Sequence, residues 1–550
     1  SSGADTCCDR KFCKPFQMTI FHTVLFTVAA VAALANCCVE LRRCLMMLQQ
    51  NSYRPERYRK WLSQSADSTS GLRLTGFIVL LFCITPFCPP VAGAVLMIVF
   101  LAFCISVQSR RRYKKPLVMT RRAMRIYSTS LAIAVIAAGA LSLAGTGWSG
   151  GAYRMALVFL AAYCLSHVLV IVATWLLEPL ERHINAKYTA QARAILESMP
   201  GLRIVGITGS YGKTTTKHYL HAMLGEKYST LMTPGSFNTP LGVVRTIREQ
   251  LRPYHEVFIV EMGAKNIGDI DEICRIVHPH DGIITAVGPQ HLESFKTLAN
   301  VQATKFELAD SLPADGLVLV NDDFEQIADR PVGNTRCLRY AVRNTAAADY
   351  TASGIDYSPA GSTFTLNCPA DGWSLRLRTP LVGECNISNV MAAAAMAREL
   401  GVPDSSIAYA AERLEQVEHR LSIKRVPGGL TIIDDAFNSN PVGSAMALDV
   451  LAAMRPGKRI LVTPGMIELG SGQKELNEEF GFKAASAADI VIVVGHYNRQ
   501  AISEGLSRGG MGEGSVYLAD SFAHAQTILA GMASAGDTVL YENDLPDTFK

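Results

Sequence analysis

The sequence predicts an N-terminal α-helical transmembrane domain followed by two α/β domains, a P-loop parallel-sheet domain and then a Rossmann-like domain. Three observations support this prediction. Apolar residues are concentrated before residue 177 and raise the mean hydropathy of the 550-residue chain to +0.18. A glycine-rich turn follows a β-like run near residue 207. Beyond this turn, short β-like runs alternate with helical patterns, which is typical of parallel sheets wound with helices.

Four apolar stretches predict about five membrane spans within residues 1–177, because a helix needs about 20 residues to cross a bilayer. The second stretch is too long for one crossing and contains prolines at positions 86, 89 and 90. We therefore expect a helical hairpin there, formed either by two short crossings or by a re-entrant pair. The four stretches are Met18–Cys38, Thr75–Val107, Tyr127–Ala144 and Met155–Leu176.

The loop charges predict the orientation of these spans. Basic residues are concentrated in two segments, residues 42–60 after the first span and residues 110–125 after the hairpin. The positive-inside rule places both segments in the cytoplasm. The N-terminus is then outside, with Cys7, Cys8 and Cys13, and the sequence leaves open whether these cysteines form disulfides. Everything after Leu177 is expected in the cytoplasm, beginning with a linker helix over residues 178–199.

The composition excludes some functional classes. The 52 basic and 48 acidic residues nearly balance, so no nucleic-acid partner is implied. No two of the 14 cysteines form a C-x-x-C pair, which argues against a zinc ribbon or a thioredoxin-like site. The scattered cysteines suit a reducing compartment.

The glycine-rich turn has the composition of a phosphate-binding loop. It follows the β-like run Leu202–Ile207 and opens a helical pattern. Glycines let backbone N–H groups approach an anion, lysine neutralises phosphate charge, and a threonine hydroxyl can hold Mg²⁺. Five residues separate Gly206 from Gly212, one more than in the generic P-loop, and the alternative is a turn that binds no nucleotide. The expected nucleotide contacts are Thr208, Gly209, Ser210, Gly212, Lys213, Thr214 and Thr215.

Three further residues follow in a specific order. Glu261 ends a β-like run, where a carboxylate is suited to ligate a cation bound to phosphates. His291 follows another such run, and Lys305 lies on a predicted helix. Each of them alone is more often a structural or surface residue, so the specific signal is their order after the phosphate loop.

These motifs resemble those of the Mur ligase family, whose members use ATP to join a carboxylate to an amine. The resemblance implies that Mg²⁺ is held by Thr214, Glu261, His291 and Lys305, with Lys305 carbamylated so that it offers an oxygen ligand. It also implies catalytic roles for Lys213, Lys305, His291 and Arg420.

Later motifs extend the resemblance to the nucleotide. Asn321 matches an asparagine on the adenine side of the nucleotide, and Asn386 and Asn389 match residues that fix phosphate or water. Arg420 matches an arginine that contacts phosphate, and Asp435 matches an aspartate that contacts the ribose. Capping of a helix by Asn386 is the alternative for that residue. The segments 434–441 and 465–470 are most similar to the MurF branch, which adds D-alanyl-D-alanine to a muramyl tripeptide.

The resemblance covers roughly residues 200–545 and implies a central ATP-binding domain over 200–415 and a C-terminal domain over 416–550. Two departures from the MurF branch concern the substrate. Membrane spans stand where the branch has its UDP-binding domain, which we expect this chain to lack. The acidic segment 541–547 stands where the branch has a basic one.

We therefore expect an ATP- and Mg²⁺-dependent amide ligase integral to the bacterial cytoplasmic membrane, with its ligase domains in the cytoplasm. Its acceptor would be a small-molecule or lipid-linked precursor of peptidoglycan or another envelope polymer, activated as an acyl phosphate. Membrane lipids are expected to contact the basic segments, and protein partners are left open. The alternatives are a capsule-type poly-γ-glutamate ligase and an ATP-driven transporter or nucleotide-gated scaffold. Against a transporter, the predicted spans contain almost no charge besides His167.

Overall fold

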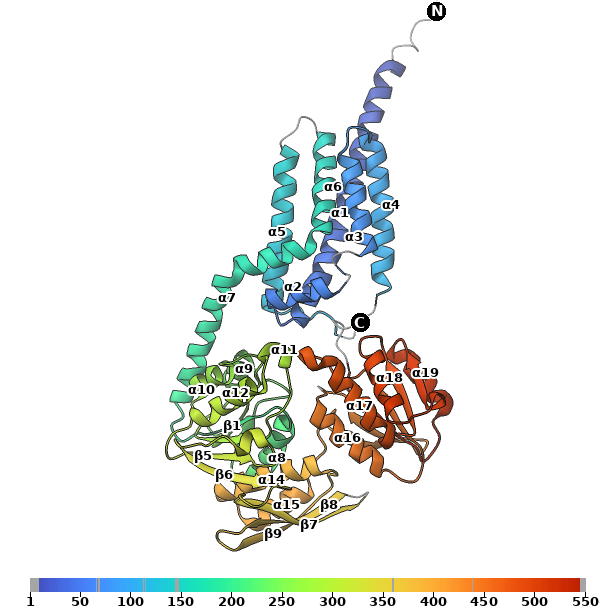
Figure 1. Cartoon of the computed structure of the whole chain (residues 1–550). Coiled ribbons are helices and arrows are strands. Elements are labelled where there is room, and N and C mark those ends of the chain that lie inside the picture. Colours follow the sequence, from blue (N-terminus) through green and yellow to red (C-terminus); the bar gives the residue numbers. More distant parts are fainter. Residues whose placement is uncertain are drawn as a thin grey trace, which may run out of the picture. The chain divides into compact units, whose positions relative to one another are not determined.

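The computed structural model describes residues 9–544 except 66, 68–69, 112, 114, 144–147, 359–360 and 438. It forms two compact units, a helical unit that ends at Ile184 and an α/β unit that begins at Asn185 (Figure 1). Cys7, Cys8, the side chain of Cys13 and Asn438 lie outside what the structure describes, and the predictions made for them stay predictions.

The described part of the helical unit contains three helices long and apolar enough to cross a membrane, or up to four if a bent pair counts as one span. The predicted hairpin is confirmed as α3 and α4, which the prolines separate; α3 is a shorter apolar helix of 14 residues. The helices are α1 (Asp9–Gln50), α2 (Pro55–Gln64), α3 (Gly71–Ile84), α4 (Pro90–Ser109), α5 (Arg121–Leu143), α6 (Trp148–Cys164) and α7 (Ser166–Glu197).

The last predicted span is not one straight helix. α6 and α7 meet at an angle of 81°, and α7 continues without interruption through the predicted linker helix. Arg73 stabilises the break, since its Nη1 donates to the carbonyl oxygen of Cys164 at 3.0 Å and to Oγ of Ser166 at 2.9 Å. A buried guanidinium that captures a main-chain carbonyl is a sufficient cause for a kink without proline or glycine.

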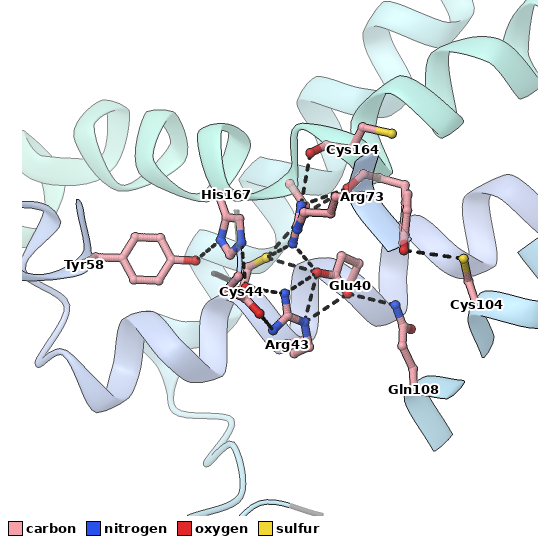
Figure 2. Close-up of polar contacts among 12 residues, drawn as sticks. Glu40, Arg43, Cys44, Tyr58, Arg73, Cys104, Gln108, Cys164 and His167 are labelled. Atoms are coloured by element: carbon pink, nitrogen blue, oxygen red, sulfur yellow. Dashed lines mark hydrogen bonds and ion pairs between the residues drawn. The ribbon is translucent and has the colours of Figure 1, made fainter. Parts of the chain in front are cut away.

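A buried network of charged side chains lies beside this break (Figure 2). Glu40 accepts hydrogen bonds from Arg43, Arg73 and Gln108, and Glu40 and Arg73 are only 3% and 2% exposed. His167 donates or accepts at both ring nitrogens, toward Asp67 at 2.9 Å and toward the hydroxyl of Tyr58 at 2.6 Å. Within the bounds of the predicted spans the expectation of almost no charge besides His167 holds. The charged residues of the network lie just outside those bounds, because α1 and α3 extend beyond the apolar runs.

The first part of the α/β unit, here called the central domain, is built on a sheet of nine described strands in the order β2-β3-β1-β4-β5-β6-β7-β8-β9. The predicted parallel pairing is correct from β2 to β7 and wrong for β8 and β9, which pair antiparallel because hairpins connect them. The strands are β1 (Arg203–Thr208), β2 (Thr230–Met232), β3 (Val257–Glu261), β4 (Asp281–Ile284), β5 (Leu317–Asn321), β6 (Arg336–Ala341), β7 (Tyr350–Ser358), β8 (Gly361–Cys368) and β9 (Trp373–Thr379).

Helices cover both faces of this sheet, so its central strands are buried on both sides. Alternate residues of β1 face opposite cores: Val205 packs with α8 and α14, and Ile204 packs with α9, α10 and α12. The helices are α8 (Lys213–Gly225), α9 (Pro240–Gln250), α10 (Asp269–Val277), α11 (Leu292–Phe295), α12 (Leu298–Asp310), α13 (Glu325–Ala328), α14 (Glu384–Glu399) and α15 (Asp404–Glu412).

The second part of the unit, the C-terminal domain, has a sheet of six described strands in the order β10-β11-β15-β12-β13-β14, parallel except for β10. Its core lies between the sheet and α16, α17 and α18, and α19 covers the other face. The elements are β10 (Ser422–Arg425), β11 (Thr431–Asp435), α16 (Pro441–Ala453), β12 (Arg459–Thr463), α17 (Gln473–Ala487), β13 (Ile490–Val494), α18 (Arg499–Arg508), β14 (Val516–Ala519), α19 (Phe522–Met532) and β15 (Thr538–Glu542).

Candidate active site

The loop between β1 and α8 is a tight cradle that needs glycine at two positions. Gly209 has φ +150°, and a Cβ atom there would lie 2.1 Å from Oγ1 of Thr285. Gly212 has φ +75° as the N-cap of α8, and its Cβ would lie 2.5 Å from Oδ1 of Asn389. The backbone therefore comes closer to its neighbours than a side chain allows, and it leads directly into the N-terminus of a helix, where N–H groups are free to bind an anion.

Lys213 bends back over this loop. Its Nζ donates to the carbonyl oxygens of Gly209 at 2.6 Å and Ser210 at 3.3 Å. Burial lowers the pKa of Lys213 to about 8, with Glu261 opposing and Arg420 adding to the decrease. A phosphate bound at the loop would stabilise the charged form of Lys213 and raise this pKa again.

Two other predicted loop contacts bond to the fold through their side chains, and a third is buried. The Oγ1 of Thr208 donates to the carbonyl oxygen of Met262 at 3.0 Å, and Oγ of Ser210 donates to that of Gly288 at 3.1 Å. Thr215 is buried in the first turn of α8. The side chains of Thr208 and Ser210 are thus engaged with the fold, and their backbone is left to meet a ligand.

Glu261, at the end of β3, lies next to the first turn of α8. Its Oε1 accepts hydrogen bonds from Oγ1 of Thr214 at 3.2 Å and Nδ2 of Asn238 at 3.0 Å, and its Oε2 pairs with Nζ of Lys217 at 2.9 Å. Burial would raise the pKa of Glu261, but the charges of Lys217 and then Lys213 outweigh it and lower the pKa. A carboxylate and a hydroxyl this close are a fitting pair of oxygen donors for Mg²⁺.

Lys217 was not predicted from the sequence. Its side chain is 0% exposed and also donates to the carbonyl oxygen of Gly235 at 2.6 Å. The available signal was its position four residues after Lys213, which places both lysines on the same side of α8.

Lys305 is 1% exposed in the interior of α12. Burial lowers its pKa well below the ordinary range, and the charge of Lys213 lowers it further. Among the described residues no carboxylate forms an ion pair with it. Glu307, its neighbour in the Lys-x-Glu motif, accepts hydrogen bonds from backbone N–H groups at the start of α10, including that of Gly268 at 2.7 Å, and is therefore structural.

His291 contacts the C-terminal domain. Its Nδ1 bonds to the carboxylate of Glu468, which also pairs with Nζ of Lys265 at 3.3 Å. Burial lowers the pKa of His291 although Glu468 opposes the shift. The structure thus pairs His291 with Glu468 and shows no bond from it to Thr214 or Glu261. The described residues contain no group of three His, Cys, Asp or Glu side chains suited to a metal ion.

Arg420 also joins the two domains at the start of α8. Its Nη2 lies 3.5 Å from Oγ1 of Thr214, and its guanidinium lies 4.3 Å from the ring centre of Phe437. Asp435, which ends β11, accepts a hydrogen bond from the N–H of Leu421 at 3.0 Å. The C-terminal domain therefore presents an arginine at the phosphate loop, and the Asp435 carboxylate faces this arginine.

The three predicted asparagines have protein partners. Nδ2 of Asn321 donates to the carbonyl oxygen of Thr285 at 2.9 Å, and Oδ1 of Asn389 accepts from Thr216 at 3.1 Å. Asn386 is buried within α14 and donates to the carbonyl oxygen of Val382 at 2.9 Å. Gly383 is the N-cap of α14, so the capping alternative for Asn386 is wrong. Asn389 lies against the cradle at Gly212. Asn321 reaches the cradle only through Thr285, whose hydroxyl donates to the carbonyl oxygen of Tyr211.

Comparisons with known proteins identify relatives of this chain. Residues 207–397 match the Mur ligase middle domain, and residues 419–541 match the Mur ligase, glutamate ligase domain. The UDP-N-acetylmuramoyl-tripeptide–D-alanyl-D-alanine ligase of Escherichia coli is 33% identical over 315 residues, 56% of this chain and 68% of that protein. The Bacillus subtilis ligase of the same name is 30% identical over 291 residues, 53% of this chain and 62% of that protein.

A solved structure agrees with these sequence matches. The crystal structure of MurF ligase from Thermotoga maritima in complex with ADP has a TM-score of 0.57 and 26% identity, covering 66% of this chain and 80% of that one. The chain thus spans about two thirds of the length of the curated relatives that it matches.

Proposed function

The chain belongs to the Mur ligase family, whose members are ATP-dependent amide ligases, and from this premise we propose that it joins the carboxylate of an envelope precursor to an amine. The observation that carries the proposal is the meeting of Lys213, Thr214, Glu261 and Arg420 at the start of α8. An amide ligase needs such a cluster, because it must bind a polyphosphate and offset negative charge while a phosphoryl group moves.

Each residue has a distinct part in the proposed reaction. The N–H groups of the cradle and Lys213 bind the phosphates of ATP, and Arg420 contributes a second positive charge from the C-terminal domain. An oxygen of the substrate carboxylate attacks the γ-phosphorus, the bond to the β-phosphate oxygen breaks, and an acyl phosphate and ADP result. The amine then attacks the acyl carbon, and inorganic phosphate leaves as the amide forms.

Thr214 and Glu261 are the residues that would hold Mg²⁺, and a carbamylated Lys305 would add an oxygen ligand. His291, which bonds to Glu468 in this structure, would have to leave that carboxylate to join them. When bound, Mg²⁺ neutralises charge on the phosphates. Carbamylation requires a neutral amine that adds CO₂ and releases a proton. The burial of Lys305 and its lowered pKa favour that neutral form.

We place the reaction at the cytoplasmic face of a membrane. The helical unit supports this location, because large apolar side chains face away from its core, among them Ile78, Leu81, Val99 and Ile136 at 63–71% exposure. An acceptor that is lipid-linked would then lie close to the enzyme. The named relatives act on a UDP-linked tripeptide, so the choice between UDP-linked and lipid-linked acceptors defines the test.

The proposed function is tested by incubating the full chain with ATP, Mg²⁺, D-alanyl-D-alanine and either the UDP-linked tripeptide or its lipid-linked counterpart. We expect phosphate release that requires an acceptor, an amide product identified by mass spectrometry, and faster use of the lipid-linked acceptor. Lys213→Ala should abolish phosphate release, and Lys227→Ala, an exposed lysine beyond the end of the same helix, is the matched control.

The outcomes separate the alternatives. Phosphate release without an acceptor and without any amide product would contradict a ligase and favour the transporter reading. Equal use of both acceptors would reduce the helical unit to an anchor, and polymerisation of glutamate would favour the poly-γ-glutamate ligase.

A further inference from the structure

Two segments at the carboxyl ends of adjacent parallel strands border Glu261. Residues 233–241 lead from β2 into α9, and residues 262–268 follow β3. The segments touch each other, because the N–H of Gly263 donates to the carbonyl oxygen of Asn238 at 2.8 Å. They form one edge of the candidate active site, and we call them the rim.

The rim exposes large apolar side chains. Ile267 is 60% exposed, Leu241 42% and Phe237 37%. Leu241 and Arg245 lie one turn apart on the exposed face of α9, and the guanidinium of Arg245 lies 5.5 Å from the ring centre of Phe237. Exposed apolar residues are ordinary when they are scattered singly, whereas a group of them beside an active site indicates an interaction surface.

The charges at the rim favour an anionic partner. The structure describes every residue of the rim, and none of them is an aspartate or glutamate. Arg245, which pairs with Glu249, and Lys265, which pairs with Glu468, are 60% and 40% exposed and keep much of their charge open to solvent. An apolar surface that has basic residues at its border and no acid within it complements the interface of an anionic bilayer.

α7 connects α9, the helix that the rim leads into, with the last predicted membrane span. Ala192 of α7 is buried in the core beneath α9. Arg248 of α9 lies 3.9 Å from the ring centre of Tyr188 and donates to Gln191 at 2.9 Å. Tyr188 follows Leu176, where the predicted span ends, by about 12 residues, which is about 18 Å along a helix. Under the proposed membrane location, this short helical connection keeps α9 close to the bilayer.

We propose that the rim docks on the surface of an anionic bilayer, with Phe237, Leu241 and Ile267 in contact with lipid, so that the active site opens at the membrane. This inference rests on the proposed function and deepens it. A lipid-linked acceptor would reach the site without leaving the bilayer, whereas a soluble UDP-linked acceptor would gain nothing from the contact.

Quenching of tryptophan fluorescence by brominated lipids measures this contact and needs no catalysis. In the full chain the four native tryptophans are replaced by phenylalanine, and Leu241→Trp, Ile267→Trp or Tyr254→Trp is introduced. Tyr254 is 68% exposed and precedes β3, at the opposite end of the strand from the rim, so it is the matched control. The protein is reconstituted in nanodiscs of brominated phosphatidylcholine and phosphatidylglycerol.

We expect quenching at positions 241 and 267 and none at position 254. High salt should weaken the quenching, because it screens the basic residues from the anionic headgroups.

Acidic substitutions test what the contact does for the reaction. Leu241→Asp and Ile267→Asp should each lower kcat/KM for the lipid-linked acceptor by about tenfold, because the apolar side chain no longer enters the bilayer. Use of the UDP-linked acceptor should be nearly unchanged. An acid in the first turn of α9 is favoured by the helix dipole, so Leu241→Asp keeps the fold. Tyr254→Asp should change neither reaction.

Three results would overturn the inference. Absence of quenching at positions 241 and 267, or equal quenching at all three positions, would mean that the rim makes no specific contact with lipid. Equal losses with both acceptors would make the rim part of the catalytic site. Shielding of both positions that grows with protein concentration, without quenching by lipid, would assign the rim to a second copy of the chain. Absence of phosphate release with either acceptor would instead refute the proposed function, and the quenching would still decide whether the rim meets the bilayer.

Discussion

Replacement of Lys217 by methionine tests how Glu261 is held in the site. Lys217 and Glu261 are 0% and 1% exposed, and their charged atoms lie 2.9 Å apart. Methionine keeps the apolar stem and removes the ammonium, so Glu261 would remain buried with only the hydrogen bonds from Thr214 and Asn238. Breaking a buried pair in this way typically costs about 3–5 kcal/mol. The two remaining donors satisfy part of the carboxylate, and we therefore expect about 3 kcal/mol of lost stability.

The measurement is denaturant unfolding of the full chain, followed by the fluorescence of Trp373. The other three tryptophans, at positions 61, 148 and 175, lie in the helical unit, so each is replaced by phenylalanine in the reference protein. The double variant Lys217→Met/Glu261→Gln should recover most of the loss, because no buried charge is left unpaired. Lys227→Met, at an exposed lysine, should cost less than about 1 kcal/mol.

Two results would refute this reasoning. A Lys217→Met variant within about 1 kcal/mol of the reference would mean that the pair contributes little. Additive losses in the double variant would mean that the two side chains do not act on each other.

Three further predictions concern other buried groups. Lys305→Ala should strongly lower the rate of ligation, and added formate or acetate should partly restore it. A wild-type rate in this variant would mean that Lys305 has only a structural role. Burial raises the pKa of Asp435 from 3.8 to about 6, so the folded state keeps this proton to higher pH than the unfolded state does. The free energy of unfolding should therefore fall as the pH rises from about 4 through about 6, and Asp435→Asn should flatten this decline. The single variant Arg73→Met should destabilise the helical unit more than the double variant Arg73→Met/Glu40→Gln, because the single change leaves Glu40 buried without its partner. Thermal unfolding in detergent measures the stability of both variants.

The α/β character of the chain was predictable because its strands are short apolar runs bounded by polar residues. Val257–Val260 and Ile490–Val494 were located within one residue of β3 and β13. The antiparallel strands β7–β9 were missed, since polar residues alternate with apolar ones along them and no continuous apolar run marks their place. The break between α6 and α7 was not predictable, because its cause is an arginine more than 90 residues away in the chain.

From the sequence, the order of the motifs located the phosphate loop and Glu261. The bonding partners of the site side chains could not be predicted, because they come from segments far apart in the chain. Thr214 and Glu261 meet because β1 and β3 are adjacent strands, which the apolar pattern alone does not reveal. The sequence indicated Glu542 only as a member of the acidic segment 541–547. Its position opposite Asp435 depends on β15 lying next to β11, although the two strands are far apart in sequence.

Backbone strain occurs at two of the places where the C-terminal domain contacts the central domain. Residues other than glycine rarely adopt positive φ. His291 and Glu468, which form one of the contacts, have φ +50° and +62°. His419 and Leu421, the neighbours of Arg420 in the chain, have φ +58° and +51°. Each such residue costs about 1–3 kcal/mol, which the surrounding structure must offset. Five other non-glycine residues of the described chain also have positive φ, so this conformation is not confined to the contacts; they are Ser52, Tyr53, His278, Lys296 and Asn543. At the contacts, the strained backbone carries Arg420 and Glu468 to the central domain, and the bonds that these side chains make there help to offset its cost.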